Sequence, residues 1–139
     1  MDNDTLEILK KAARKDFYMN NSDVLSVLKE AVGALSEKKA IDVQAFKVDD
    51  ISSLTDYVVV CSGTSSTHMK SLASFVEMKL DRNSKLTYHK EGYDSDYWIL
   101  MDFGCVIINI FLPEAREFYN LEEFWKSAQP VDTDKLLSP

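Results

Sequence analysis

The stretch that decides the fold is YVVVCSGTSS, residues 57–66. An unbroken run of β-branched and aromatic residues is typical of a central strand that is covered on both faces. The polar turn after it can cap a helix, and apolar residues recur at helical spacing from Met69 to Leu80. With a short strand predicted at residues 86–88, this order of elements indicates a right-handed crossover unit.

Two more apolar runs follow at residues 97–101 and 105–111. They are separated by Asp102–Phe103–Gly104, which predicts an antiparallel hairpin with the glycine at positive φ. With a two-residue loop, Leu100 would face Ile107 and Trp98 would face Asn109. We expect short helical segments at 113–119 and 121–126, and then a flexible tail over residues 128–139, which hold two of the three prolines.

The segments before residue 57 complete a single α/β domain. Apolar positions change parity within residues 41–48, which indicates a strand with a bulge. An amphipathic helix is predicted from a cap at Ser22 to about residue 38, preceded by a helical extension over residues 1–20. We therefore predict a mixed five-stranded sheet flanked by helices, with the main domain spanning residues 21–127 and an extra N-terminal helical segment.

Composition excludes several classes of protein. The 139 residues suit one domain, and 16 basic against 23 acidic residues give a net charge of −7, which disfavours a groove that grips nucleic acid and favours a basic partner. Cys61 and Cys105 stand alone in apolar runs, so neither a disulfide scaffold nor a zinc site is expected. No segment reads as a membrane span or a secretion signal, so we expect a cytoplasmic protein.

The sequence offers two kinds of candidate catalytic residue. Ser62–Ser65 follows a strand as in nucleotidyltransferases, which also need clustered carboxylates to hold two metal ions. The acidic residues available are Asp94, Asp96 and Asp102, two of them in a loop, and His68 and His89 have no nucleophile beside them. A metal-dependent enzyme acting on nucleotides therefore stays the alternative hypothesis, and turn and cap roles are favoured.

Trp98 is open to two interpretations. In the hairpin it shares a face with Leu100, Asn109 and Phe111, so it is either a core residue or an aromatic anchor in a partner interface. Periodicity does not decide which face of the sheet stays uncovered.

Four stretches of the chain together form a recognisable pattern. They are TDYVVVCSGTS at 55–65, EG at 91–92 with WILMDFG at 98–104, VIINIF at 106–111 and REFYNLEEFW at 116–125. In this order, over about residues 22–126, they resemble the ribosomal silencing factor family (RsfS, Iojap-related). The family commonly has His where this chain has Asn109, so no acid, base or metal-ligand role is carried over to that position.

The resemblance implies a regulator that is not an enzyme and has a nucleotidyltransferase-like fold. Such proteins bind the large ribosomal subunit through its fourteenth ribosomal protein, block association with the small subunit and repress translation. The resemblance also implies little direct contact with RNA, no cofactor or metal, and a homodimer as an oligomeric state.

The expected contact residues lie on the hairpin and just after the last strand. The family pattern Tyr-x-Leu-Glu maps onto residues 119–122, beside the hairpin if the chain turns back at Pro113. Glutamates are expected to meet Lys or Arg of a basic partner, and Arg116 to hold the C-terminal helix. The candidate partner-binding residues are Trp98, Met101, Tyr119, Leu121, Glu122 and Glu91.

Overall fold

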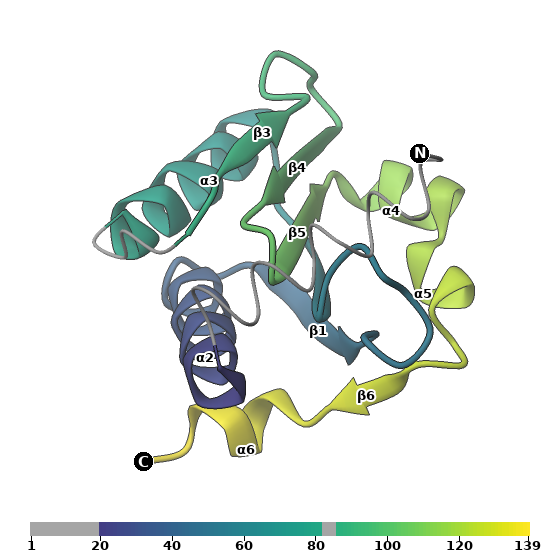
Figure 1. The fold of residues 1–139 in the computed structure, drawn as a ribbon. Coiled ribbons are helices and arrows are strands. Elements are labelled where there is room, and N and C mark those ends of the chain that lie inside the picture. The colour runs from purple at the N-terminus through teal and green to yellow at the C-terminus, as the bar shows by residue number, and fades with distance from the viewer. Residues whose placement is uncertain (1–19, 82–85) are drawn as a thin grey trace, which may run out of the picture.

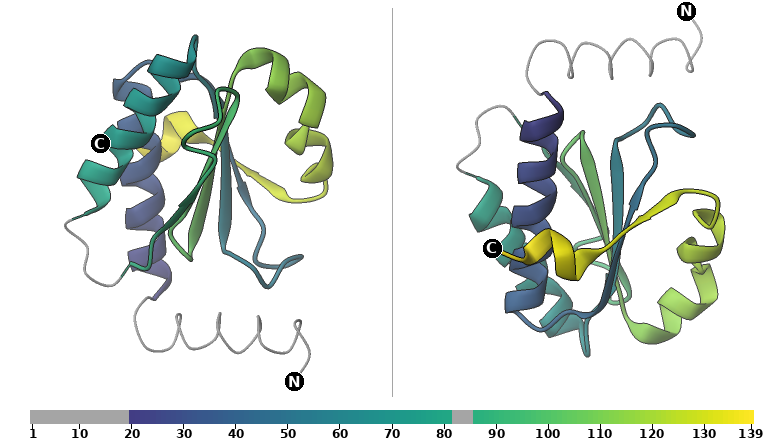
Figure 2. Two further views of the ribbon diagram at one scale, coloured as in Figure 1. Left: turned by 90° about the horizontal axis from the view of Figure 1, so that it is seen from above. Right: turned by 90° about the horizontal axis from the view of Figure 1, so that it is seen from below.

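The chain folds into three layers, with a mixed sheet between two groups of helices (Figures 1 and 2). The computed structural model describes residues 20–81 and 86–139. The elements, in chain order, are α2 (Asn21–Glu37), β1 (Ile41–Lys47), β2 (Tyr57–Ser62), α3 (Ser66–Leu80), β3 (His89–Glu91), β4 (Trp98–Asp102), β5 (Val106–Phe111), α4 (Pro113–Tyr119), α5 (Leu121–Phe124), β6 (Gln129–Val131) and α6 (Thr133–Leu137).

The sheet confirms the predicted mixed α/β class and adds one strand. Its order is β3-β4-β5-β2-β1-β6, and β2 and β5 form its parallel pair. The crossover expected from YVVVCSGTSS is present. After β2, α3 packs against β4 and β5 and leads to β3, which runs in the same direction as β2. The strand predicted at residues 86–88 is found at His89–Glu91 instead.

The prediction of a flexible C-terminal tail is wrong. Residues 129–131 form β6, which pairs antiparallel with β1, and α6 follows it toward α2. Leu136 and Leu137 pack against the core. Pro130 lies on an edge strand, where a missing N–H costs nothing, so the prolines that suggested disorder are compatible with a sheet.

The hairpin places the same side chains together on each face as predicted, but its strands pair in a different register. Trp98 pairs with Phe111, and Leu100 pairs with Asn109, two residues away from the prediction. The connection is longer than two residues, with Gly104 at φ 83° as expected. A slip of two residues keeps every side chain on its own face, whereas a slip of one would exchange the faces.

The first described helix and strand differ from prediction only in detail. Asn20, and not Ser22, is the N-cap of α2, and it forms a capping box with Asp23. The predicted bulge in β1 is present between Ile41 and Gln44. Residues 1–19 of the predicted extension lie outside the described residues, and Asn20 is the N-cap of α2.

Each face of the sheet has its own core. The face under α2 and α3 packs aliphatic side chains from both helices against Val59, Ile99 and Ile108. The face under α4 and α5 has a smaller cluster that includes Phe46 and Phe111. Because β2 is covered on both sides, all of its residues are buried, as its unbroken apolar run predicts.

Candidate partner-binding surface

Trp98 begins β4 on the face of the sheet that α4 and α5 cover. Its ring centroid lies 4.8 Å from that of Phe111 and 4.8 Å from that of Tyr119. Its Nε1–H donates a hydrogen bond of 3.0 Å to Oδ1 of Asn109. The side chain is half-buried, so its inner edge belongs to the core while part of the ring stays accessible.

Tyr119, the last residue of α4, contacts the rings of Tyr97 and Trp98 at the start of β4. It is 41% exposed and stacks on Tyr97, with centroids 6.4 Å apart. Phe118 meets it edge-on at 5.1 Å and is 81% exposed. We call Tyr97, Trp98, Phe118 and Tyr119 the aromatic surface. The predicted proximity of the hairpin and the segment that follows β5 is therefore confirmed.

A pocket of about 210 Å³ borders the aromatic surface at the turn between β3 and β4. It is lined by Glu91, Gly92, Ser95, Tyr97, Trp98 and Leu100. Gly92 has φ +75°, and a Cβ there would lie 2.3 Å from the Trp98 carbonyl oxygen, so a side chain would displace the strand. Glu91 is exposed at the rim, and its carboxylate lies 2.9 Å from His89 Nε2, within hydrogen-bond distance.

Arg116 holds α4 and α5 against the start of β1 and the end of β2. Its Nε donates to Glu122 at 2.6 Å, and its other nitrogens donate to Ser62 Oγ at 3.1 Å and to the Asp42 carbonyl at 2.8 Å. The expected role of Arg116 in holding the C-terminal helix is confirmed. The Glu122 carboxylate, which was expected to meet a cation of the partner, thus has a cationic partner within the chain.

Two other predicted contact residues pack against the two cores. Leu121 is half-buried and packs with Trp125 on the second core. Met101 is 0% exposed on the opposite face of the sheet, under α3. Its assignment as a contact residue is therefore wrong: Trp98 and Met101 are an odd number of residues apart, and alternation along a strand puts them on opposite faces.

The structure separates the carboxylates of the alternative, metal-dependent site. Asp102 is the last residue of β4, whereas Asp94 and Asp96 lie in the turn before Trp98, so the length of the strand, about 13 Å at about 3.3 Å per residue, separates Asp102 from that turn. The Asp102 carboxylate accepts from the Gly104 N–H at 2.8 Å, which stabilises the hairpin turn. Within residues 20–81 and 86–139, no three His, Cys, Asp or Glu side chains gather in a way that would hold a metal ion.

The turn after β2 is held by hydrogen bonds within the chain. Ser65 Oγ caps α3 by accepting from the His68 N–H. The ring of His68 accepts from the Thr64 N–H through Nδ1 and donates to the Lys38 carbonyl through Nε2, each at 2.9 Å. Burial raises the pKa of the nearby Cys61 thiol to about 12, which keeps it protonated and unreactive at neutral pH.

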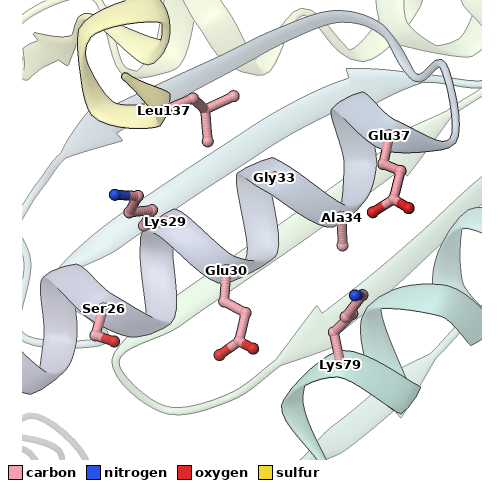
Figure 3. Close-up of a pocket in the computed structure, with 8 residues that line it drawn as sticks. All are labelled: Ser26, Lys29, Glu30, Gly33, Ala34, Glu37, Lys79 and Leu137. Atoms are coloured by element: carbon pink, nitrogen blue, oxygen red, sulfur yellow. The ribbon is translucent and has the colours of Figure 1, made fainter. Parts of the chain in front are cut away.

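A second hollow lies between α2, α3 and α6 (Figure 3). Figure 3 shows Glu30 and Glu37 of α2 and Lys79 of α3 facing the space between the two helices, with Lys29 turned toward Leu137. Two lysines and two glutamates line this hollow, so their charges cancel and favour neither an anion nor a cation. In the part of the chain that the structure describes, no helix is both long and apolar enough to cross a membrane.

Comparison with known proteins decides the family. A family model described as "Ribosomal silencing factor during starvation" matches residues 21–139. The chain belongs to this family. The match begins where α2 begins and continues through α6, so it includes the C-terminal residues that the sequence pattern assigned to a flexible tail.

Individual relatives agree with this membership. Ribosomal silencing factor RsfS of Bacillus subtilis is 34% identical over 109 residues, which cover 78% of this chain and 92% of the relative. A mouse protein named "Mitochondrial assembly of ribosomal large subunit protein 1" is 37% identical over 98 residues, 68% of this chain and 42% of its own length. A crystal structure of a Chromobacterium violaceum protein superposes with a TM-score of 0.71 at 30% identity, covering 74% of this chain and 86% of that one.

Proposed function

We propose that this ribosomal silencing factor binds the large ribosomal subunit through its fourteenth ribosomal protein and blocks association with the small subunit, which represses translation. Family membership over residues 21–139 supports a ribosome-directed silencing role. The name of the mouse relative also refers to the large subunit. Action in the cytoplasm, and a homodimer as the free form, are parts of the same proposal.

The aromatic surface is the observation that carries the proposal. Aromatic anchors at the centre of an interface supply much of its binding energy, and rigid rings lose little entropy on binding. Here the rings of Trp98 and Tyr119 are held by each other and by the core beneath them, while Tyr97 and Phe118 are exposed at 49% and 81%. A preorganised, partly exposed cluster of this kind fits a protein partner.

Charge supports a basic partner. The chain carries a net charge of −7, and exposed carboxylates of Glu91, Glu117 and Glu123 lie on the segments that form or flank the aromatic surface. Complementary charges raise the association rate and fix the orientation of encounter more than they raise affinity. Glu91, at the rim of the pocket, is the carboxylate we expect to face a Lys or Arg of the partner.

Size alone makes the bound protein an obstacle. A folded chain of 139 residues has a radius of gyration of about 14 Å. A domain of that size seated on the subunit-joining face would prevent close contact between the subunits. Steric exclusion needs no catalytic group and no bound nucleotide.

Sedimentation of purified ribosomal subunits tests the proposal. The protein should co-sediment with the large subunit and reduce the fraction of joined subunits in proportion to its occupancy. If it does neither at micromolar concentration, the proposal fails. A test with the isolated fourteenth ribosomal protein then identifies the partner within the subunit.

Tyr119→Ala tests the surface itself. Truncation of a hot-spot residue weakens binding by roughly 1–3 kcal/mol, and we expect a loss in that range with little change in melting temperature. Met78→Ala, on α3, is the matched control, because Met78 is 53% exposed on the other side of the sheet. A Tyr119→Ala protein that binds like the parent would remove this residue from the interface, and one that melts much earlier would assign it to the core.

A further inference from the structure

We propose that Asn109 is the positioning residue of the aromatic surface: its side-chain amide holds the Trp98 indole in the orientation that a partner meets. The consequence for binding rests on the proposed function. The orientation of the ring is a property of the free protein and is measured without any partner.

The position of Asn109 is unusual for its chemistry. It lies in the middle of β5 and is 3% exposed, with apolar residues on either side along the strand. Burying an amide is costly unless its hydrogen bonds are satisfied. Here Oδ1 accepts from Trp98 Nε1 at 3.0 Å, and Nδ2 donates to the Val59 carbonyl at 3.4 Å.

The sheet brings the two side chains together by register. Leu100 pairs with Asn109, and Trp98 pairs with Phe111 on the next strand over. Trp98 is therefore the diagonal neighbour of Asn109 on the same face, a separation that large side chains bridge. The hydrogen bond to the Val59 carbonyl joins the Asn109 amide to β2, the strand on the other side of β5, and so restrains the amide.

The hydrogen bond supplies direction that packing alone does not. The torsion that turns an aromatic ring about its Cβ–Cγ bond is broad and has more than one allowed well. The contacts of Trp98 with Phe111 and Tyr119 are ring contacts, which tolerate more than one ring orientation. With Nε1 bound to Asn109, the one polar atom of the indole points inward, and the ring offers carbon to a partner.

Asn109→Leu removes the acceptor and keeps the number and branching of the side-chain heavy atoms. In the free protein, with indole nitrogens labelled by ¹⁵N-tryptophan, we expect the Trp98 Nε1–H to exchange with solvent at least tenfold faster, while the Trp125 signal serves as an internal reference. Asn109→His, at a pH near 8 where an ordinary imidazole is neutral and accepts hydrogen bonds, should retain slow exchange. Unchanged exchange in Asn109→Leu would overturn the proposal, as would equally fast exchange in both variants.

A double-mutant cycle separates positioning from general stability. Trp98→Phe keeps a ring but has no N–H for Asn109 to hold. Asn109→Leu should weaken binding to large subunits about tenfold in the parent and by less than twofold in the Trp98→Phe background. Equal losses in both backgrounds, with the melting temperature lowered equally, would show a structural role only and would contradict the proposal.

The two readouts fail independently. If the parent protein does not bind large subunits, the proposed function fails, and the exchange measurement still decides whether Asn109 orients Trp98. If Asn109→Leu does not fold, the comparison of Asn109→His with the parent, by exchange and by affinity at the same pH, takes its place. Fast exchange or a tenfold loss of affinity in a folded Asn109→His protein would then overturn the proposal.

Discussion

The face of the sheet under α2 and α3 is packed with aliphatic side chains, whereas the face under α4 and α5 is packed with rings and clamped by one arginine. The two longer helices, α2 and α3, bury apolar stripes that include Leu28, Leu35, Leu72 and Val76. The shorter α4 and α5 have no fully buried residue. They depend instead on Arg116, which bonds to Glu122 of α5 and to Ser62 and Asp42 of the sheet.

This difference separates stability from recognition. Burial of aliphatic side chains contributes most of the folding free energy and leaves little apolar surface for a partner. On the other face, short helices cover the sheet incompletely, and half-buried rings reach solvent beside a pocket. We therefore expect substitutions on the α2–α3 face to change unfolding, and substitutions on the α4–α5 face to change binding first.

The largest expected effect is on the α2–α3 face. Met101→Ala should lower the free energy of unfolding by about 2–5 kcal/mol, as other large-to-small core substitutions do, because Met101 is 0% exposed. Urea denaturation measures this loss. Leu100→Ala, its half-buried neighbour on the other face, is the control and should cost less. A Met101→Ala protein with parental stability and weakened ribosome binding would return Met101 to the interface.

The clamp on the α4–α5 face comes next. Arg116→Met leaves the Glu122 carboxylate and the Asp42 carbonyl without their donor. Loss of one partner of a largely buried ion pair should cost about 2–4 kcal/mol, together with a loss of partner affinity as α4 and α5 loosen. Lys126→Met breaks an exposed pair with Glu123 and should stay within about 0.5 kcal/mol. Equal effects of the two substitutions would show that the clamp contributes nothing.

A smaller effect, a loss of stability at high pH, is expected from the α2–α3 face. Burial raises the pKa of Cys61 from 9.0 to about 12, so the folded protein holds this proton more tightly than the unfolded chain does. The contribution is complete below about pH 9 and is lost as the pH rises toward 12, at up to about 1.4 kcal/mol per pH unit. Burial also raises the pKa of Tyr88, which adds to the loss above pH 10.

Urea denaturation at pH 8, 9 and 10 measures this loss, with Cys61→Ala as the comparison. The alanine variant starts from a lower stability, but its stability should fall less steeply with pH. Identical slopes for the two proteins would show that Cys61 does not supply the dependence. Slopes of the unfolding free energy against pH that differ by up to about 1.4 kcal/mol per pH unit, which corresponds to one proton, would confirm that the thiol is protonated in the folded core.

The smallest expected effect is at the N-terminus. Deletion of residues 1–19 should leave affinity for the large subunit within twofold of the parent, because the family match begins at residue 21 and the aromatic surface is formed by residues 97–98 and 118–119. Asn20 is kept because it caps α2. Loss of ribosome binding, with an unchanged circular dichroism spectrum, would assign the extension to the interface.

Local patterns predicted most of the fold. The run Tyr57–Cys61, the apolar stripes of α2 and α3, and the glycine at the hairpin turn each depend on neighbours in sequence, and each is confirmed. The hairpin register and β6 were missed. Both depend on pairing between strands, and a two-residue change in register alters neither the pattern of faces nor the apolar content of the strand.

The sequence by itself determined the mixed α/β class, the crossover after β2 and the shared face of Trp98, Asn109 and Phe111, because alternation and helical periodicity are written into the order of residues. Only the tertiary structure decided which of those residues meet. It placed Met101 under α3, joined Arg116 to Glu122 and Asp42, and brought Asn109 to the indole of Trp98. Contacts between distant segments depend on register and helix placement, which many sequences with the same pattern would satisfy differently.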